Sequence, residues 1–196
     1  SINSTTFTVI KHNSTVEIGV DAIHYVNDTF TINVTSNTTV NVTVSPIFVD
    51  QTARINITGP EDITGYVIVT VNGVNYSVIL NNGIGHVDVK GLGNGTYNVN
   101  VTYLENDKYS SAVNGTKLIV SKLNTTVTIE VKNITYGDVA EIVISVPGVE
   151  FGNITVRLNS TEKVLTIING KAYWNVTGLA AENYTVAAIF NGNYKY

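Results

Sequence analysis

The chain has 196 residues, of which 43% are hydrophobic and only 13% are charged, with a formal net charge of −4. That length suits one large or two ordinary domains, and the apolar share is enough to bury a core. The negative charge and the lack of a basic stripe argue against a nucleic-acid partner, and the absence of cysteine excludes disulfides, thiolate metal sites and cysteine nucleophiles.

The first elements in the chain are predicted to be pieces of modules rather than a whole domain. The segment 1–16, SINSTTFTVIKHNSTV, aligns with 111–127, which places Asn3 on Asn114 and Asn13 on Asn124. Residues 1–11 are therefore predicted to be the last strand of an upstream or neighbouring module, and 12–36 a partial module with only the first two strands. Strand addition to an open sheet edge is one way to use such a segment. The candidates for strand complementation are its apolar residues Phe7, Val9 and Ile10.

The next 87 residues, 37–123, are predicted to form an immunoglobulin-like domain. The first strand is the stretch NTTVNVTV, in which valines alternate with polar residues at the period of a half-buried strand. Turn signals such as Asn72-Gly73 and Asn82-Gly83 separate the strands, and no sustained helical period is found. About seven strands in this length are typical of an immunoglobulin-like sandwich. We expect these strands near 39–44, 53–58, 66–71, 75–80, 86–90, 96–103 and 116–121.

The remaining residues, 124–196, repeat the first domain without its last strand. With an offset of 87 residues, 37–109 falls on 124–196 without a gap, and 23 of the 73 positions are identical. A period near 90 residues fits tandem whole domains better than a solenoid. The predicted fold class is therefore all-β, with tandem immunoglobulin-like antiparallel β-sandwich domains. Either a second copy supplies the missing strand head-to-tail, or the array continues covalently in a longer protein.

The inward-facing residues follow from the alternation. In 37–123 they should include Val40, Val42, Val44, Ile55, Ile57, Val67, Val69, Val71, Val87, Val89, Tyr97, Val99 and Val101. In 124–196 they should include Ile142, Ile144, Ile154, Val156, Leu158, Trp174, Val176, Tyr184, Val186 and Ala188. A sugar-stacking platform is the alternative for Trp174, but we expect a core residue packed between two sheets. Tyr97 and Tyr184 are predicted to be tyrosine corners, with the hydroxyl bonded to the backbone of the preceding turn.

Asn-x-Ser/Thr sequons occur 17 times in the chain, whereas its composition would give about five by chance. In a strand, residues i and i+2 share a face, so the Asn and Thr of one sequon point outward together. Polar filling of the wet face explains the threonines, because Thr suits strands, but not the frequent choice of Asn. Attachment of N-glycans to an exported protein explains both. The glycosylation candidates are Asn41, Asn56, Asn100, Asn114, Asn133, Asn153 and Asn175.

Two phrases of the sequence resemble a known group of proteins: NGVNYSVILNNGIGHVDVKGLGNGTYNVNVTYLENDKYSSA and NSTEKVLTIINGKAYWNVTGLAAENYTVAAIFNGNYKY. They look like the bacterial-type Ig-like repeats of large adhesin-like cell-surface proteins, especially those of methanogenic archaea. The resemblance covers most of the chain and is specific for fold. It implies stalk or spacer modules on an extracellular surface, in which a binding activity is rarely assignable to one repeat.

No chemistry-bearing motif stands out. His12, His24 and His86 are scattered without metal-ligand spacing, and no nucleophile elbow or phosphate-binding loop appears. A loop Ca²⁺ site would need five or more oxygen ligands that the sequence does not place, and a Lys–Asn isopeptide bond is not expected at Lys117, its best candidate, because Thr6 stands at the equivalent N-terminal position. We expect no enzyme activity, no cofactor, no metal and no membrane span in this chain, which starts without Met and is expected to be processed or excised.

Three functions fit these patterns. The favoured one is a structural, glycosylated segment or subunit of an extracellular surface fibre or adhesin stalk, assembled head-to-tail by β-strand complementation or as covalent tandem modules. The alternative is a ligand-binding adhesin module that recognises a glycan or protein on a host or neighbouring cell. A third, an accessory module of a secreted hydrolase, would need a catalytic domain beside it, and none is found in the sequence.

Overall fold

The computed structural model describes residues 35–196, which are all β and contain no helix. They separate into two compact units. Unit 1 runs through Pro46 and then holds Thr52–Lys90 and Thr96–Ile119, and unit 2 holds Ile47–Gln51, Gly91–Gly95 and Val120–Tyr196. Residues 37–123 are called the first copy below and residues 124–196 the second copy. The predicted strand 1–11 and nearly all of the predicted partial module 12–36 lie outside the described residues.

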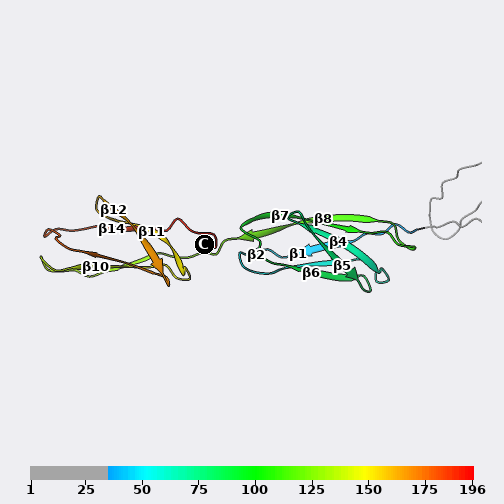
Figure 1. The fold of residues 1–196 in the computed structure, drawn as a ribbon, viewed down its shortest axis with the longest axis horizontal. Helices are drawn as coiled ribbons and strands as arrows, with labels where there is room; N and C mark the ends of the chain where they lie inside the picture. Colours follow the sequence, from blue (N-terminus) through cyan, green and yellow to red (C-terminus); the bar gives the residue numbers. More distant parts are fainter. Residues whose placement is uncertain (1–34) are drawn as a thin grey trace, which may run out of the picture. The chain divides into compact units, whose positions relative to one another are not determined.

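The first copy is a sandwich of two sheets, with strand orders β1-β3-β6 and β2-β8-β7-β4-β5. Figure 1 draws β7 and β8 along one side of this copy and β1 and β6 along the other. All seven predicted strands are present, and the two-residue β2 is an eighth that the sequence did not reveal. The strands are β1 (Asn41–Val44), β2 (Ile47–Phe48), β3 (Ala53–Thr58), β4 (Gly65–Val71), β5 (Val74–Leu80), β6 (Ile84–Val89), β7 (Gly95–Tyr103) and β8 (Ala112–Ser121).

Asn-Gly turns fix the register of the hairpins. Asn72 has φ 51° and Gly73 has φ 75°, and the next turn repeats this with Asn82 at 49° and Gly83 at 75°. Two successive residues with positive φ are what a type I′ turn requires, and Asn-Gly is its preferred pair. Gly83 has a second constraint, because a Cβ there would lie 2.4 Å from the carbonyl oxygen of Pro60. The turn dipeptides read from the sequence therefore mark real strand ends.

The second copy has six strands in the order β14-β11-β12-β13-β10-β9. They correspond at the 87-residue offset to β7, β4, β5, β6, β3 and β1 of the first copy. Residues 134–135, at the offset of β2, form no strand, and the described residues end before the offset of β8 is reached. The strands are β9 (Thr128–Val131), β10 (Ala140–Ser145), β11 (Phe151–Leu158), β12 (Thr161–Ile168), β13 (Lys171–Val176) and β14 (Val186–Ile189).

The core residues confirm the predicted alternation. Ile55 and Ile57 of the first copy and Ile142 and Ile144 of the second have no exposed surface. Trp174 is 8% exposed and packs into the core cluster of the second copy, so it is a core residue and not an exposed stacking platform. Seven residues predicted to be inward are only half-buried: Val44, Val87, Tyr97, Val176, Tyr184, Val186 and Ala188. Together these strands confirm the all-β fold of tandem immunoglobulin-like sandwiches.

Candidate functional site

Every sequon asparagine among the described residues is exposed. Six of the seven glycosylation candidates lie on strands, and Asn133 lies in the segment after β9. Five of these six strand positions lie on the solvent face, as the alternation predicted, whereas Asn114 is on the same face of β8 as the buried Leu118 and Val120. The exposed sequon asparagines are Asn37, Asn41, Asn56, Asn75, Asn94, Asn100, Asn114, Asn124, Asn133, Asn153, Asn159, Asn175 and Asn183.

Two sequons of the first copy oppose one another across the antiparallel pair β1–β3. In this register Asn41 faces Thr58, and Thr43 faces Asn56. Directly opposite side chains in a sheet lie close enough to interact, and a polar pair of this kind contributes a few tenths of a kcal/mol, roughly 0.2–1. Cross-strand pairing is thus a structural use of Asn-x-Thr, and the exposure of both asparagines also leaves room for a glycan.

Asn114 differs from the other candidates because both Nδ2 and Oδ1 of its side-chain amide make hydrogen bonds to the backbone. Its Nδ2 donates to the carbonyl oxygen of Val40 at 2.7 Å, and its Oδ1 accepts from the backbone N–H of Gly115 at 2.7 Å. Glycan attachment takes place on the same Nδ2 and replaces one of its two hydrogens, so a glycan there would have to be accommodated beside the bond that ties β8 to the segment before β1. Asn114 is therefore a structural residue of the folded module.

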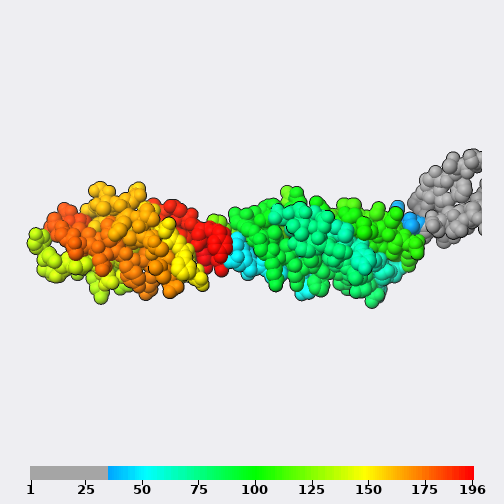
Figure 2. Space-filling view, in the orientation of Figure 1, coloured from blue at the N-terminus to red at the C-terminus, as the bar shows by residue number. Residues whose placement is uncertain are grey.

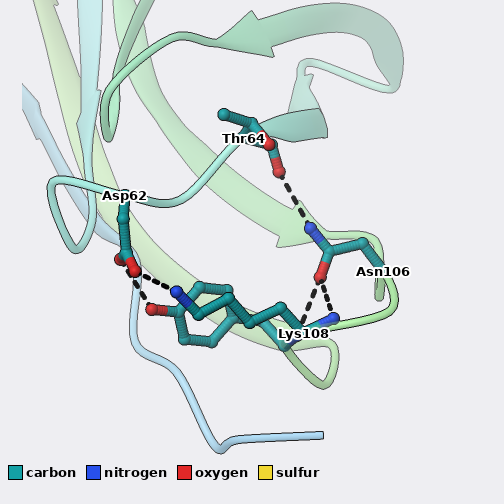
Figure 3. Close-up of polar contacts among 5 residues, drawn as sticks. Asp62, Thr64, Asn106 and Lys108 are labelled. Carbon is teal, nitrogen blue, oxygen red and sulfur yellow. Dashed lines mark hydrogen bonds and ion pairs between the residues drawn. The ribbon is translucent and has the colours of Figure 1, made fainter.

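A cluster of polar side chains closes one end of unit 1. The carboxylate of Asp62 accepts hydrogen bonds from the Lys108 ammonium and from the Tyr109 hydroxyl, the latter at 2.6 Å (Figure 3). Asn106 supports this pair, since its Oδ1 accepts from the backbone N–H of Lys108 at 2.9 Å and of Tyr109 at 2.7 Å. Its Nδ2 donates to the carbonyl oxygen of Thr64 at 3.3 Å. We call Asp62, Asn106, Lys108 and Tyr109 the loop clamp.

The groups of the loop clamp shift one another's pKa values. The hydrogen bonds from Lys108 and then Tyr109 hold the pKa of Asp62 below its ordinary value. The hydrogen bond and charge of Asp62 in turn raise the pKa of Lys108 and, together with burial, the pKa of Tyr109. All three shifts favour the state in which Asp62 is ionised, Lys108 is protonated and Tyr109 is neutral.

Part of the loop clamp recurs in unit 2. Asn193 accepts from the backbone N–H groups of Lys195 and Tyr196, both at 2.9 Å, as Asn106 does in unit 1. The backbone N–H of Ser36 donates to the carbonyl oxygen of Lys108 at 2.7 Å, and that of Leu123 donates to Lys195 at 2.8 Å. In each unit, therefore, the segment that enters the copy is bonded to this loop. Figure 2 shows the blue start of the described chain against the green surface of this part of the first copy.

We expect the contribution of the loop clamp to fade in acid. A carboxyl whose folded-state pKa is lowered stabilises the fold above its unfolded pKa, and this stabilisation is lost as the pH falls through the folded value. Asp62→Asn should therefore lower the stability of unit 1 at neutral pH, and the difference from wild type should shrink well below pH 3.8, the ordinary Asp value. Urea unfolding of both proteins at neutral and acid pH measures this.

The control for that experiment is Asp107→Asn, an exposed neighbour in the same loop. It should change stability little at either pH. A penalty for Asp62→Asn that stayed constant with pH would contradict the ion pair and leave only packing as its cause.

A groove of about 380 Å³ lies at one end of β9 and β14 in the second copy. Its walls come from residues 131–136, at and after the end of β9, and from residues 179–184 before β14, with Ile142, Leu158 and Val186 also among the lining residues. Tyr184 is part of the wall formed by residues 179–184. Its hydroxyl accepts from the backbone N–H of Ala180 at 3.0 Å, which confirms the tyrosine corner, and burial raises the pKa of Tyr184.

The other predicted site residues either have a clear position in the structure or lie outside the described residues. Phe7, Val9 and Ile10, the strand-complementation candidates, lie outside the described residues, as do His12 and His24. His86 contacts Arg54 on the outer face of β3–β6, with Nη2 of Arg54 at 2.6 Å from Nε2 of His86. Lys117 is exposed, whereas an isopeptide bond would need a buried lysine. Within residues 35–196 no cluster of metal-ligating side chains occurs, and no helix there could cross a membrane.

No protein-family model matches the chain, and no curated protein does. Among solved structures it is similar to a protein from Corynebacterium diphtheriae described as membrane anchored, at 14% identity over 63% of this chain and 34% of that one, with a TM-score of 0.35. It is also similar to a chimeric titin Z1Z2-Z1Z2 tandem, at 12% identity over 75% of this chain and 93% of that one, TM-score 0.30. The third is chicken CNTN1 FN1-FN3, at 12% identity over 79% and 58%, TM-score 0.28. Likenesses this distant carry no information about function.

Proposed function

We propose that the chain is a structural, glycosylated segment or subunit of an extracellular surface fibre or adhesin stalk, in which modules join head-to-tail through their β-strands. The observation that carries this proposal is the tandem repeat of sandwich modules whose exposed strand faces hold sequons instead of charges. The resemblance of its repeats to those of archaeal adhesin-like proteins supports the same function. No catalytic role is proposed.

A low-charge, sequon-rich surface suits a stalk for a physical reason. With only 13% charged residues, the solvent faces depend on Asn, Thr and Ser for hydration. Glycans on exposed asparagines would add bulk and solubility without adding charge. They would also cover outward apolar residues such as Ile79 and Ile84, which are 54% and 65% exposed. Hydration and protection from proteases are what an extended surface structure needs.

We expect native protein to carry N-glycans on Asn41, Asn56, Asn100 and Asn175, whose side chains lie on exposed strand faces. Asn114 should be the least occupied of the seven candidates, because its Nδ2 is already bonded to Val40. Glycopeptide mapping of material purified from the native source reports all of these sites at once. Unmodified asparagines at all four positions would contradict the glycosylation part of the proposal.

The location of the protein in the cell tests the fibre or stalk part of the proposal. Immunogold labelling of native cells, with antibodies raised against residues 37–196, should place the label along fibres or stalks that extend from the surface. Label confined to the cell interior, or to a uniform layer without extended structures, would overturn the proposal. Label concentrated at the tips of such structures would instead favour the alternative, a ligand-binding adhesin module.

One observation bears on that alternative. Tyr136 and Tyr194 are 77% and 70% exposed and lie outside the strands, where a ligand-binding module would place aromatic residues. Tyr136, however, corresponds at the repeat offset to Val49, which is only 4% exposed in the first copy. An exposed residue at this position is therefore not a shared feature of the two copies, and the structural function remains the better supported one.

A further inference from the structure

Among the described residues of the first copy, four strands lie at sheet edges, and β5 alone has neither of the usual protections. The backbone N–H and C=O groups of an edge strand can pair with another chain, so edge strands are usually short or charged. β1 and β2 have only four and two residues, and β6 carries Asp88. β5 has seven residues, VNYSVIL, with no charge and no proline, and within residues 35–196 it pairs only with β4. A strand of this kind is prone to pair with a second copy of itself.

The turn before β5 shows which part of its edge is open. The residues on either side of the two-residue turn Asn72-Gly73 form a hydrogen-bonded pair, so from Asn75 on the backbone groups of every second residue point away from β4. Ile79 belongs to this set, but β6 lies against it, since a Cβ on Gly85 would be 3.1 Å from the carbonyl oxygen of Ile79. The open edge therefore consists of Asn75 and Ser77, which are the Asn and Ser of one sequon.

The side chain of Asn75 is oriented so that its amide nitrogen faces this edge. The hydroxyl of Thr70 on β4 donates to Oδ1 of Asn75 at 2.7 Å. Oδ1 is thus turned toward β4, and Nδ2, which has no hydrogen-bond partner among the described residues, lies on the side of the open edge. Asn75 is exposed, and it differs from Asn114, whose Nδ2 donates to Val40. A glycan on Asn75 would therefore displace no hydrogen bond and would stand beside the edge.

The second copy protects the equivalent strand with charges. β12 is the counterpart of β5, and it has Glu162 at the position of Asn75, followed by Lys163. Glu162 accepts from Nε of Arg157 at 2.6 Å, at the same cross-strand position where Thr70 bonds to Asn75. One cross-strand pair is thus ionic in the second copy and contains a sequon in the first. Charge discourages edge pairing, and bulk at the same position would do so as well.

Resting on the glycosylated surface of the proposed function, we propose that Asn75 carries an N-glycan whose bulk keeps the β5 edge from pairing with β5 of another chain. The modification forms a bond from Nδ2 to the anomeric carbon of a sugar that is carried on a lipid phosphate or pyrophosphate donor. The carbon–oxygen bond of the donor breaks, the lipid phosphate leaves with the electron pair, and one amide hydrogen leaves Nδ2 as a proton. Asn75 thereby joins the seven glycosylation candidates, with a specific task at a sheet edge.

The absence of cysteine allows a direct test of the edge on the full chain. Ser77→Cys protein from a bacterial host that adds no N-glycans should be cross-linked to a dimer by a short bis-maleimide. The matched control is Val164→Cys, at the equivalent position of β12 and 60% exposed, which should stay monomeric. Adding Asn75→Glu to the Ser77→Cys chain should abolish the dimer band, because both pairing edges would then be charged. Adding Asn98→Glu, the same change on the central strand β7, should leave the band unchanged.

Two results of this experiment would overturn the proposal. A Ser77→Cys chain that stays monomeric without glycans would show that the β5 edge needs no protection. A dimer that survives Asn75→Glu, or that Asn98→Glu removes equally, would show that the contact does not run through this edge.

Glycopeptide mapping of native protein tests the modification itself. The peptide that contains Asn75 should carry a glycan, and an unmodified Asn75 would overturn the proposal. If Asn75 were bare while the four strand asparagines expected above carried glycans, the glycosylated function would stand and only this site would be wrong. If all five were bare, the glycosylated function would fall with it. A glycan on Asn75 together with immunogold label away from extended structures would leave this site in place and remove the fibre function.

Discussion

Trp174→Ala is expected to destabilise the second copy by about 3–5 kcal/mol, the usual cost of removing a large buried aromatic side chain. Trp174 is 8% exposed and packs in one cluster with Ile142 and Ile144. The ammonium of Lys163 lies 5.7 Å from the centre of its ring, and such a contact contributes about 0.5–1 kcal/mol at an exposed site. Urea unfolding followed by far-ultraviolet circular dichroism measures the loss.

The matched control is Tyr173→Ala, which removes an aromatic ring from the same strand but from its solvent face. Tyr173 is 55% exposed, so its loss should change stability by no more than about 0.5 kcal/mol. Equal effects of the two substitutions would contradict the assignment of Trp174 to the core. They would also return Trp174 to consideration as a sugar-binding residue.

The strands were predictable because their signals are local. Alternation of apolar and polar residues gave 53–58, which is the range of β3, and the Asn-Gly turns at 72–73 and 82–83 fixed the neighbouring hairpins. β2 was missed for the opposite reason. A two-residue strand has no period to detect, and Ile47–Phe48 is a strand only because β8 lies beside it.

The loop clamp was not predictable from local patterns, because its members lie far apart in the sequence. Asp62 reaches Lys108 and Tyr109, which are 46 and 47 residues later. The repeat held a partial signal, since Asn106, Lys108 and Tyr109 all have identical counterparts in the second copy. Asp62 corresponds to Val149, however, so the repeat contained no hint of the carboxylate.

The sequons show how far a motif can be trusted. Their period predicted the exposed face correctly at Asn41, Asn56, Asn100 and Asn175. The same motif at Asn114 marks a side chain whose amide is bonded to the backbone on both sides. All five sites match the same Asn-x-Thr motif, and only the three-dimensional structure shows whether the amide nitrogen is free for a glycan.

Leu118→Ala is expected to destabilise the first copy by about 2–5 kcal/mol. Leu118 has no exposed surface and, with Val120, holds β8 against the core. A cavity at this position would loosen the strand that closes the sandwich, and β2 would lose its partner with it. Ile119→Ala is the control, because Ile119 is 48% exposed on the other face of the same strand and should cost little. Urea unfolding of the three proteins gives both values.

The same measurement also tests how β8 is held against the sandwich. A large loss for Leu118→Ala combined with a small one for Ile119→Ala would show that the closing strand is held through its inward face. A negligible loss for Leu118→Ala would contradict this, since β8 would then be held mainly by its backbone pairing with β7 and β2.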